Sequence, residues 1–313
     1  MKIKKRPLLL VDDLSSESSL DSRSRAIRFI AGKLAQRLDA PIDLICVENL
    51  LYYPKGQSPF KRLTDAYLRE QKSKILNIAE SFTVPTRGSL INGEPAEEII
   101  ALAAKLNKYE MIILGTSGRT GVRRIFLGSV AEEVIRNTRI PVMTVGPKAQ
   151  NRMAKFFADP KLTILIPTSL TANSLRAEAY GVEIAKRLDA QVIFFHSMRE
   201  ALPAMMQVAF MNPHSVSAIQ RYVEDNKDLL QKELDQKCKK AFKLGLSASG
   251  VLDHETFSAS ESIVKEIVRS KVSLVVMGTH GHSFYSRFFF GRTLRDVVLR
   301  AEVPVISLHS RLR

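Results

Sequence analysis

The chain has 313 residues, of which 45% are hydrophobic and 25% are charged, close to the averages of soluble globular proteins. This composition excludes a disordered or collagen-like chain, and a length of 313 residues predicts two domains. The cysteines Cys46 and Cys238 lie far apart without metal-ligand spacing, which argues against a disulfide framework or a zinc site and favours a reducing compartment.

The net charge is +15, from 47 basic and 32 acidic residues. Such a charge favours polyanionic partners, namely nucleotides, nucleic acid or an anionic membrane surface. The N-terminal MKIKKRPLLLV begins like a signal peptide, but Asp12 and Asp13 end its apolar run, so we predict a first strand. No stretch approaches the roughly 18 uninterrupted apolar residues of a transmembrane helix. We therefore expect a cytoplasmic protein.

The predicted elements alternate along each half of the chain. LLLV at 8–11 predicts a strand, 26–38 a helix, DLICV at 43–47 a strand and 63–81 a helix, and further pairs follow. The runs MIILG at 111–115 and LVVMG at 274–278 are continuously apolar, as is typical of central parallel strands. This alternation predicts an α/β fold with a mainly parallel sheet that is covered on both faces.

An internal repeat relates the two halves. LDAPIDLICV at 38–47 recurs as LDAQVIFFHS at 188–197, and IPVMTV at 140–145 recurs as VPVISL at 303–308. The chain is therefore a diverged duplication. We predict a first domain at 1–147, a linker at 148–160 and a second domain at 161–313. The second half is longer around a methionine-rich stretch at 199–220, which predicts core or subunit packing, with a lid or a binding surface for an apolar ligand as alternatives.

A glycine motif in the first half predicts a phosphate site. Gly115 and Gly118 follow the strand MIIL, and Gly128-Ser129 follows nine residues later, where Val130 opens a helical pattern. Glycines let backbone N–H groups approach an anion, and a helix N-terminus offers unpaired donors. Ser129 and Glu132 also form a capping-box pattern, so capping is an alternative or additional role of Ser129. The glycines alone are also compatible with tight turns.

The spacing G-x2-G-x9-G-S, followed by VAEEVIRNTRIPVMTV, resembles the nucleotide-binding signature of universal stress proteins. NGEPAEEII at 92–100 is also similar to a segment of that family. The resemblance covers nearly all of both halves. It implies two tandem doubly wound domains with five-stranded sheets, of the adenine-nucleotide alpha-hydrolase type, and a stress-related role with ATP, ADP or AMP as ligand, ATP with Mg²⁺.

The resemblance also implies a role for each residue of the motif. An aspartate at the end of the first strand meets the adenine, which is Asp13 or its neighbour Asp12, with the second half favouring Asp13. Backbone at Val47 contacts the base. The glycines and the closing serine contact the ribose and phosphates, and we add Val130 and Arg119 to this set. The set is Gly115, Gly118, Arg119, Gly128, Ser129 and Val130.

Purely structural roles are an alternative to these assignments. Aspartates after a strand also serve turns. Arg119, Arg123 and Arg124 supplement the phosphate donors or form a solvated basic loop. No catalytic residue and no metal ligand is assigned.

The second half keeps the glycine spacing but changes two positions. Ser169 replaces Asp13, and Arg292 replaces the closing serine. The loss of a charged acceptor predicts a vestigial second site. His280 and His282 lie two residues apart without a third ligand, so we read them as polar loop residues.

The leading hypothesis is a regulatory protein whose first domain binds an adenine nucleotide. Within the family the last strands pair, so 141–145 and 304–308 are expected to join the halves as a pseudo-dimer, and a homodimer is expected as well. The alternatives are a slow ATPase, a scaffold that binds no nucleotide, and nucleic-acid binding through the positive charge. The sequence has no P-loop lysine that would support an ATPase. It also has no aromatic–basic reader motif that would support nucleic-acid binding.

Overall fold

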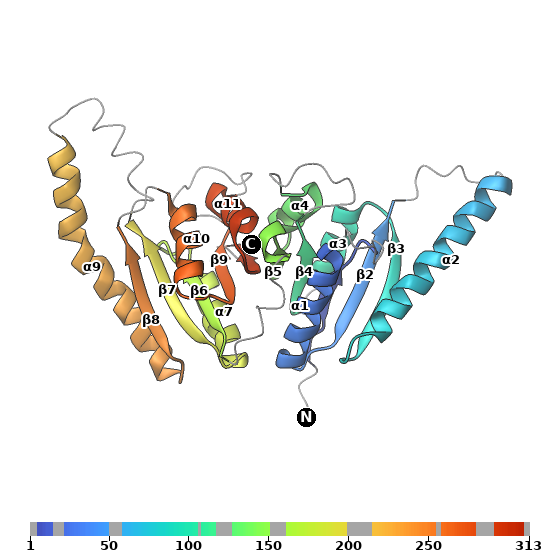
Figure 1. Cartoon of the computed structure of the whole chain (residues 1–313), viewed down its shortest axis with the longest axis horizontal. Coiled ribbons are helices and arrows are strands. Elements are labelled where there is room, and N and C mark those ends of the chain that lie inside the picture. Colours follow the sequence, from blue (N-terminus) through green and yellow to red (C-terminus); the bar gives the residue numbers. More distant parts are fainter. Residues whose placement is uncertain are drawn as a thin grey trace. The chain divides into compact units, whose positions relative to one another are not determined.

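The computed structural model describes residues 5–14, 22–49, 58–105, 108–116, 127–150, 161–198, 215–254, 258–279 and 291–309. The chain divides into two compact units, Met1–Met153 and Ala154–Arg313. Each unit alternates strands and helices, as the sequence predicts (Figure 1). No helix in the described ranges combines the length and the apolarity that a membrane span requires.

The first unit holds one parallel sheet in the order β3-β2-β1-β4-β5. Every residue of β1 and β4 is buried or half-buried, because helices cover both faces of a doubly wound sheet. The elements run β1 (Leu8–Val11), α1 (Ser22–Leu38), β2 (Ile42–Glu48), α2 (Ser58–Glu80), β3 (Thr86–Asn92), α3 (Pro95–Ala103), β4 (Met111–Gly115), α4 (Ser129–Asn137), β5 (Val142–Val145) and α5 (Pro147–Gln150).

The second unit repeats this topology with a parallel sheet in the order β8-β7-β6-β9-β10. Leu8 pairs with Ile42 in the first sheet, and Ile164 pairs with Val192 in the second, so the registers correspond. Its elements run β6 (Thr163–Pro167), α7 (Leu175–Arg187), β7 (Gln191–Ser197), α9 (Ser215–Lys243), β8 (Ala248–Asp253), α10 (Ala259–Arg269), β9 (Leu274–Gly278), α11 (Arg292–Arg300) and β10 (Val305–Leu308).

The predicted fold class is confirmed: each unit is a doubly wound α/β domain with five parallel strands. Apolar residues at helical spacing bury one face of α1, namely Ala26, Ile30 and Leu34, each fully buried. Of the predicted linker, the residues before 151 belong to α5, which packs against α1, and 151–160 lie outside the described residues. The methionine-rich stretch is also outside them up to residue 214.

A glycine in each edge strand lets a long helix lie close to the sheet. α2 packs on β3, and α9 packs on β8 (Figure 1). A Cβ atom added at Gly88 would lie 2.9 Å from the carbonyl oxygen of Ile75, and one at Gly250 would lie 2.9 Å from Cβ of Leu234. These separations are shorter than real Cβ contacts. The repeat has therefore kept glycine where the helix crosses the strand.

We expect Gly88→Ala to destabilise the chain by about 1–3 kcal/mol, because the added methyl meets backbone that cannot turn away. Thermal unfolding of the full chain measures this loss. Gly32→Ala is the matched control: its Cβ would lie 3.3 Å from the ring of Phe82, which can shift, and alanine is the better helix former. Unchanged unfolding of Gly88→Ala would contradict the close-packing explanation.

Candidate functional site

The candidate site lies at the carboxyl ends of β1 and β4. The strand order reverses at this point, because α1 leads from β1 to β2 on one side while β4 lies on the other. Connections that diverge leave a crevice at the end of the strands, which is where open α/β sheets bind ligands. Asp12 and Asp13 follow β1, and Thr116 follows Gly115 at the end of β4. The sheet thus brings the predicted aspartates and the start of the glycine motif to one edge.

Asp12 is committed to an internal ion pair. It is 4% exposed, and its two carboxylate oxygens accept hydrogen bonds from Nε and Nη2 of Arg28 at 2.6 and 3.0 Å. The N–H of Leu14 donates to the same carboxylate at 2.8 Å, and Leu14 has a left-handed backbone with φ of 52°. Buried charges are tolerated only when they are paired in this way. Asp12 therefore shapes the turn after β1 through its contacts with Arg28 and Leu14.

Asp13, the next residue, lies in a different environment from Asp12. It is half-buried, and its Oδ1 accepts a hydrogen bond from the hydroxyl of Ser24 on α1 at 2.8 Å. This bond orients the carboxylate at the strand end. A carboxylate has about four acceptor positions, so Asp13 can accept from more than one donor at a time. The structure thus separates two adjacent aspartates that the sequence alone left as alternatives.

Val47 presents its backbone toward the segment after β1. The N–H of Asp12 donates to the carbonyl of Ile45 at 2.9 Å, while the N–H of Gly93 donates to the carbonyl of Glu48 at 3.1 Å. Alternate residues of a strand direct their peptide groups to opposite neighbours. The peptide groups of Val47 therefore point to the same side as those of Ile45, the side of β1. Val47 lies beyond the end of β1, whose last residue in the register with β2 is Val11.

The two described ends of the glycine motif meet through one backbone hydrogen bond. The N–H of Gly128 donates to the carbonyl of Thr116 at 2.5 Å, so the start of α4 lies against the end of β4. Thr116 is 1% exposed, and its hydroxyl has no hydrogen-bond partner in the part of the chain that the structure describes. Buried hydroxyls are normally satisfied. The hydroxyl of Thr116 is therefore a candidate contact for a polar ligand at this strand end.

The capping-box prediction for Ser129 is wrong. Gly128 is the N-cap of α4, with φ of −59° and ψ of 142°, and no side chain caps the helix. Ser129 is the first helical residue and is exposed, while the carboxylate of Glu132 pairs with Arg136 one turn later. The N–H groups at the start of a helix lack partners within it. Those of Ser129 and Val130 therefore lie beside the end of β4.

Several predicted residues lie outside the described part of the chain. They are Gly118, Arg119, Arg123 and Arg124 in the first unit, and His280 and His282 in the second. Within the described ranges, no group of three or more histidine, cysteine, aspartate or glutamate side chains could hold a metal ion.

In the second unit the buried carboxylate lies on the helix instead of after the first strand. Thr168 occupies the position of Asp12, and Glu178 occupies that of Arg28. The hydroxyl of Thr168 donates to Oε1 of Glu178 at 2.5 Å, and Nζ of Lys237 donates to Oε2 of the same residue at 2.6 Å. Our reading of the sequence missed both pairs, although the repeat offset of 150 from Leu38 to Leu188 also aligns Arg28 with Glu178.

Two further hydroxyls of the second strand-end region are also engaged in internal contacts. Ser169, at the position of Asp13, is 8% exposed and bonds the hydroxyls of Thr171 and Ser174. The hydroxyl of Thr279, which corresponds to Thr116, lies 3.2 Å from Nδ1 of His309. The position of His309 is a glycine, Gly146, in the first unit. The hydroxyl that has no partner among the described residues of the first unit is therefore partnered in the second.

The ion pair between Asp12 and Arg28 leads to a prediction about stability. Asp12→Ala removes the buried carboxylate that pairs with the half-buried Arg28 guanidinium, so we expect a loss of about 3–5 kcal/mol. The matched control is Glu70→Ala, which removes an exposed pair with Lys74 and costs about 1 kcal/mol or less. Denaturant unfolding of the full chain compares them.

A double variant distinguishes a lost pair from a lost contact. Asp12→Ala combined with Arg28→Met leaves no buried charge, so its loss of stability should be smaller than the sum of the two single losses. Simple additivity of the two substitutions would show that the pair is not coupled.

Comparison with known proteins matches both units to one family. The profile of the universal stress protein family matches residues 6–146 and 162–309. A universal stress protein of Methanocaldococcus jannaschii is 43% identical over 135 residues, which is 42% of this chain and 76% of the relative. A universal stress protein of Mycobacterium bovis is 24% identical over 223 residues, 70% of this chain and 68% of the relative.

A solved structure agrees with the fold. The crystal structure of a universal stress protein from Archaeoglobus fulgidus aligns over 99% of this chain and 100% of its own, with a TM-score of 0.62 at 17% identity. At this identity the likeness concerns the fold. Because the family profile spans the strand-end site of the first unit and its altered counterpart in the second, the chain belongs to the universal stress protein family.

Proposed function

We propose that the first unit binds an adenine nucleotide, ATP, ADP or AMP, at the carboxyl ends of β1 and β4, and that this binding regulates an interaction of the protein in a stress response. The observation that carries the proposal is the hydrogen bond from Gly128 to Thr116. It holds the start of α4 beside the strand end where Asp13 stands. A site for a nucleotide needs both an acceptor for the base and donors for phosphate, and this edge supplies both.

Each group has a separate task in the proposed complex. The carboxylate of Asp13 accepts from the amino group of the adenine, and the backbone of Val47 borders the base. The hydroxyl of Thr116 and the N–H groups of Ser129 and Val130 serve the ribose and phosphates, because a helix N-terminus favours negative charge. Gly115 and Gly118 would admit the phosphates, and Arg119 would add a cation. Mg²⁺ would accompany ATP through the phosphates.

We propose that the second unit binds no nucleotide. Ser169 lacks the charge of Asp13, and its hydroxyl is already engaged with Thr171 and Ser174. Arg292 stands at the start of α11, where the helix dipole disfavours a cation. Pairing of the last strands, 141–145 with 304–308, as an intrachain pseudo-dimer, and a homodimer of the whole chain, belong to the same proposal.

The proposal predicts one nucleotide per chain. Mass spectrometry of small molecules released by heat denaturation identifies any ligand that co-purifies, and calorimetric titration of the ligand-free chain with ATP, ADP and AMP measures stoichiometry. Asp13→Ala should weaken binding about tenfold or more, because it removes a charged acceptor. Ser24→Ala, which keeps the carboxylate, should have a smaller effect.

A matched pair of glycine variants assigns the site to one unit. Gly128→Val should abolish binding, while Gly291→Val should leave it intact. Both glycines are N-caps with φ near −60°, so valine is compatible with the backbone in both. Two nucleotides per chain, or loss of binding with Gly291→Val, would contradict the asymmetric assignment. No binding at all would favour a scaffold, and sustained hydrolysis of bound ATP would favour the slow ATPase.

A further inference from the structure

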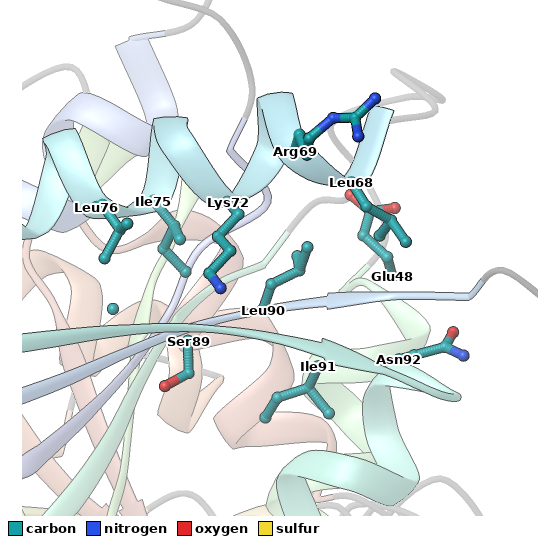
Figure 2. Close-up of a pocket in the computed structure, with 11 residues that line it drawn as sticks. Glu48, Leu68, Arg69, Lys72, Ile75, Leu76, Ser89, Leu90, Ile91 and Asn92 are labelled. Atoms are coloured by element: carbon teal, nitrogen blue, oxygen red, sulfur yellow. The ribbon is translucent and has the colours of Figure 1, made fainter. Parts of the chain in front are cut away.

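A cavity of the first unit lies away from the β1–β4 edge. It has a volume of about 560 Å³, within the usual range of ligand pockets, and opens between α2 and β3. Figure 2 shows α2 passing over the strand, with Lys72 and Ile75 directed into the space between them. We name this space the α2–β3 groove. It is lined by Glu48, Leu68, Arg69, Lys72, Ile75, Leu76, Gly88, Ser89, Leu90, Ile91 and Asn92.

The groove combines an apolar wall with an unpaired cation. Leu68 and Ile75 of α2 face Leu90 of β3, and the ammonium of Lys72 points from the helix toward the strand between them (Figure 2). Within the described ranges, Lys72 has no ion-pair or hydrogen-bond partner. The guanidinium of Arg69, at the mouth of the groove, points away from the strand and likewise has no such partner there.

The carboxylate that lines the groove is engaged elsewhere. Glu48 is 6% exposed, and its Oε1 accepts a hydrogen bond from the hydroxyl of Tyr67 at 3.0 Å. The cations at the groove are therefore available to an anion from solution. An apolar wall with a cation beside it is complementary to a molecule with a hydrocarbon body and a negative head group.

The second unit provides an internal comparison. Cβ atoms at Gly88 and Gly250 would meet Ala79 and Cys238, which aligns α2 with α9 at an offset of 159. At the positions of Leu68, Arg69, Lys72 and Leu76 the second unit has Lys227, Asp228, Gln231 and Asp235. Gln231 donates to Asp235 at 3.0 Å. The leucines and cations of the groove are thus not required by the fold.

We propose that the α2–β3 groove binds a soluble single-chain amphiphile with a carboxylate head. The hydrocarbon body lies on Leu68, Ile75 and Leu90, and the carboxylate meets the ammonium of Lys72. The site does not use the nucleotide-binding groups, so the inference stands apart from the proposed function. Its test is therefore independent of ATP binding.

Calorimetry of the full chain with dodecanoate, below its micelle concentration, tests the proposal. We expect one dodecanoate per chain, with or without ATP. Butyrate lacks the hydrocarbon body and dodecyltrimethylammonium carries the opposite charge, so both should bind much more weakly. Lys72→Gln should weaken dodecanoate binding about tenfold, because it removes a charge-assisted contact. Leu76→Asp should weaken it by a similar factor, through a charge placed beside the hydrocarbon.

The variants carry their own folding control, because Gln231 and Asp235 are the residues that the second unit has at these positions. Lys74→Gln is the matched control on the same helix, since Lys74 pairs with Glu70 and does not line the groove. It should leave the affinity within about twofold.

Three results would overturn the proposal. The first is no dodecanoate binding, or binding that Lys72→Gln and Leu76→Asp leave unchanged. The second is co-sedimentation with vesicles of anionic lipid without binding of monomeric dodecanoate, which would assign the groove to a membrane surface. The third is a chain dimer that Leu76→Asp dissociates while dodecanoate does not bind, which would assign it to a second copy.

Discussion

The reversal of strand order beside β1 is the constraint on which the candidate site depends. Parallel strands end at the same edge, and the connections that leave them there diverge only where the order reverses. In the first unit this place holds Asp13, the end of β4 and the start of α4. The hydrogen bond from Gly128 to Thr116 then fixes the helix against the strand. The backbone donors at the N-terminus of α4, which have no partners within the helix, therefore lie at this edge.

Duplication shows how such an edge can change without loss of the fold. One unit buries an aspartate against Arg28, and the other buries Glu178 between Thr168 and Lys237. Both arrangements satisfy a buried charge, as burial requires. They differ at the residue that follows, Asp13 in one unit and Ser169 in the other. The first keeps Asp13 half-buried beside Ser24, while the second uses its hydroxyls to bond one another.

At the edge strands, too, some positions are the same in both units while their neighbours differ. Gly88 and Gly250 are shared because each long helix passes too close to its strand for a side chain. Neighbouring positions on the helices have diverged in polarity. α2 presents leucines and a lysine to a cavity, where α9 presents an internal pair of Gln231 and Asp235. The two units therefore share the packing geometry of helix and edge strand, while the side chains on the outer faces of these helices differ in polarity.

The sequence by itself determined the fold class and the approximate limits of the elements. Continuous apolar runs identify buried parallel strands, and the internal repeat identifies the duplication, because these signals are local or recur in the same order in both halves. The sequence also placed the glycine motif after the correct strand. Its resemblance to one family agrees with the family profile that spans both units.

Only the tertiary structure decided what the individual side chains do. Asp12 and Asp13 are adjacent in sequence, yet one is buried against Arg28 and the other is half-buried at the strand end. The capping box failed because α4 begins one residue after Gly128, which the pattern of residue types does not specify. The α2–β3 groove depends on how a helix crosses an edge strand. Such contacts join residues distant in sequence, so their partners follow from packing rather than from local spacing.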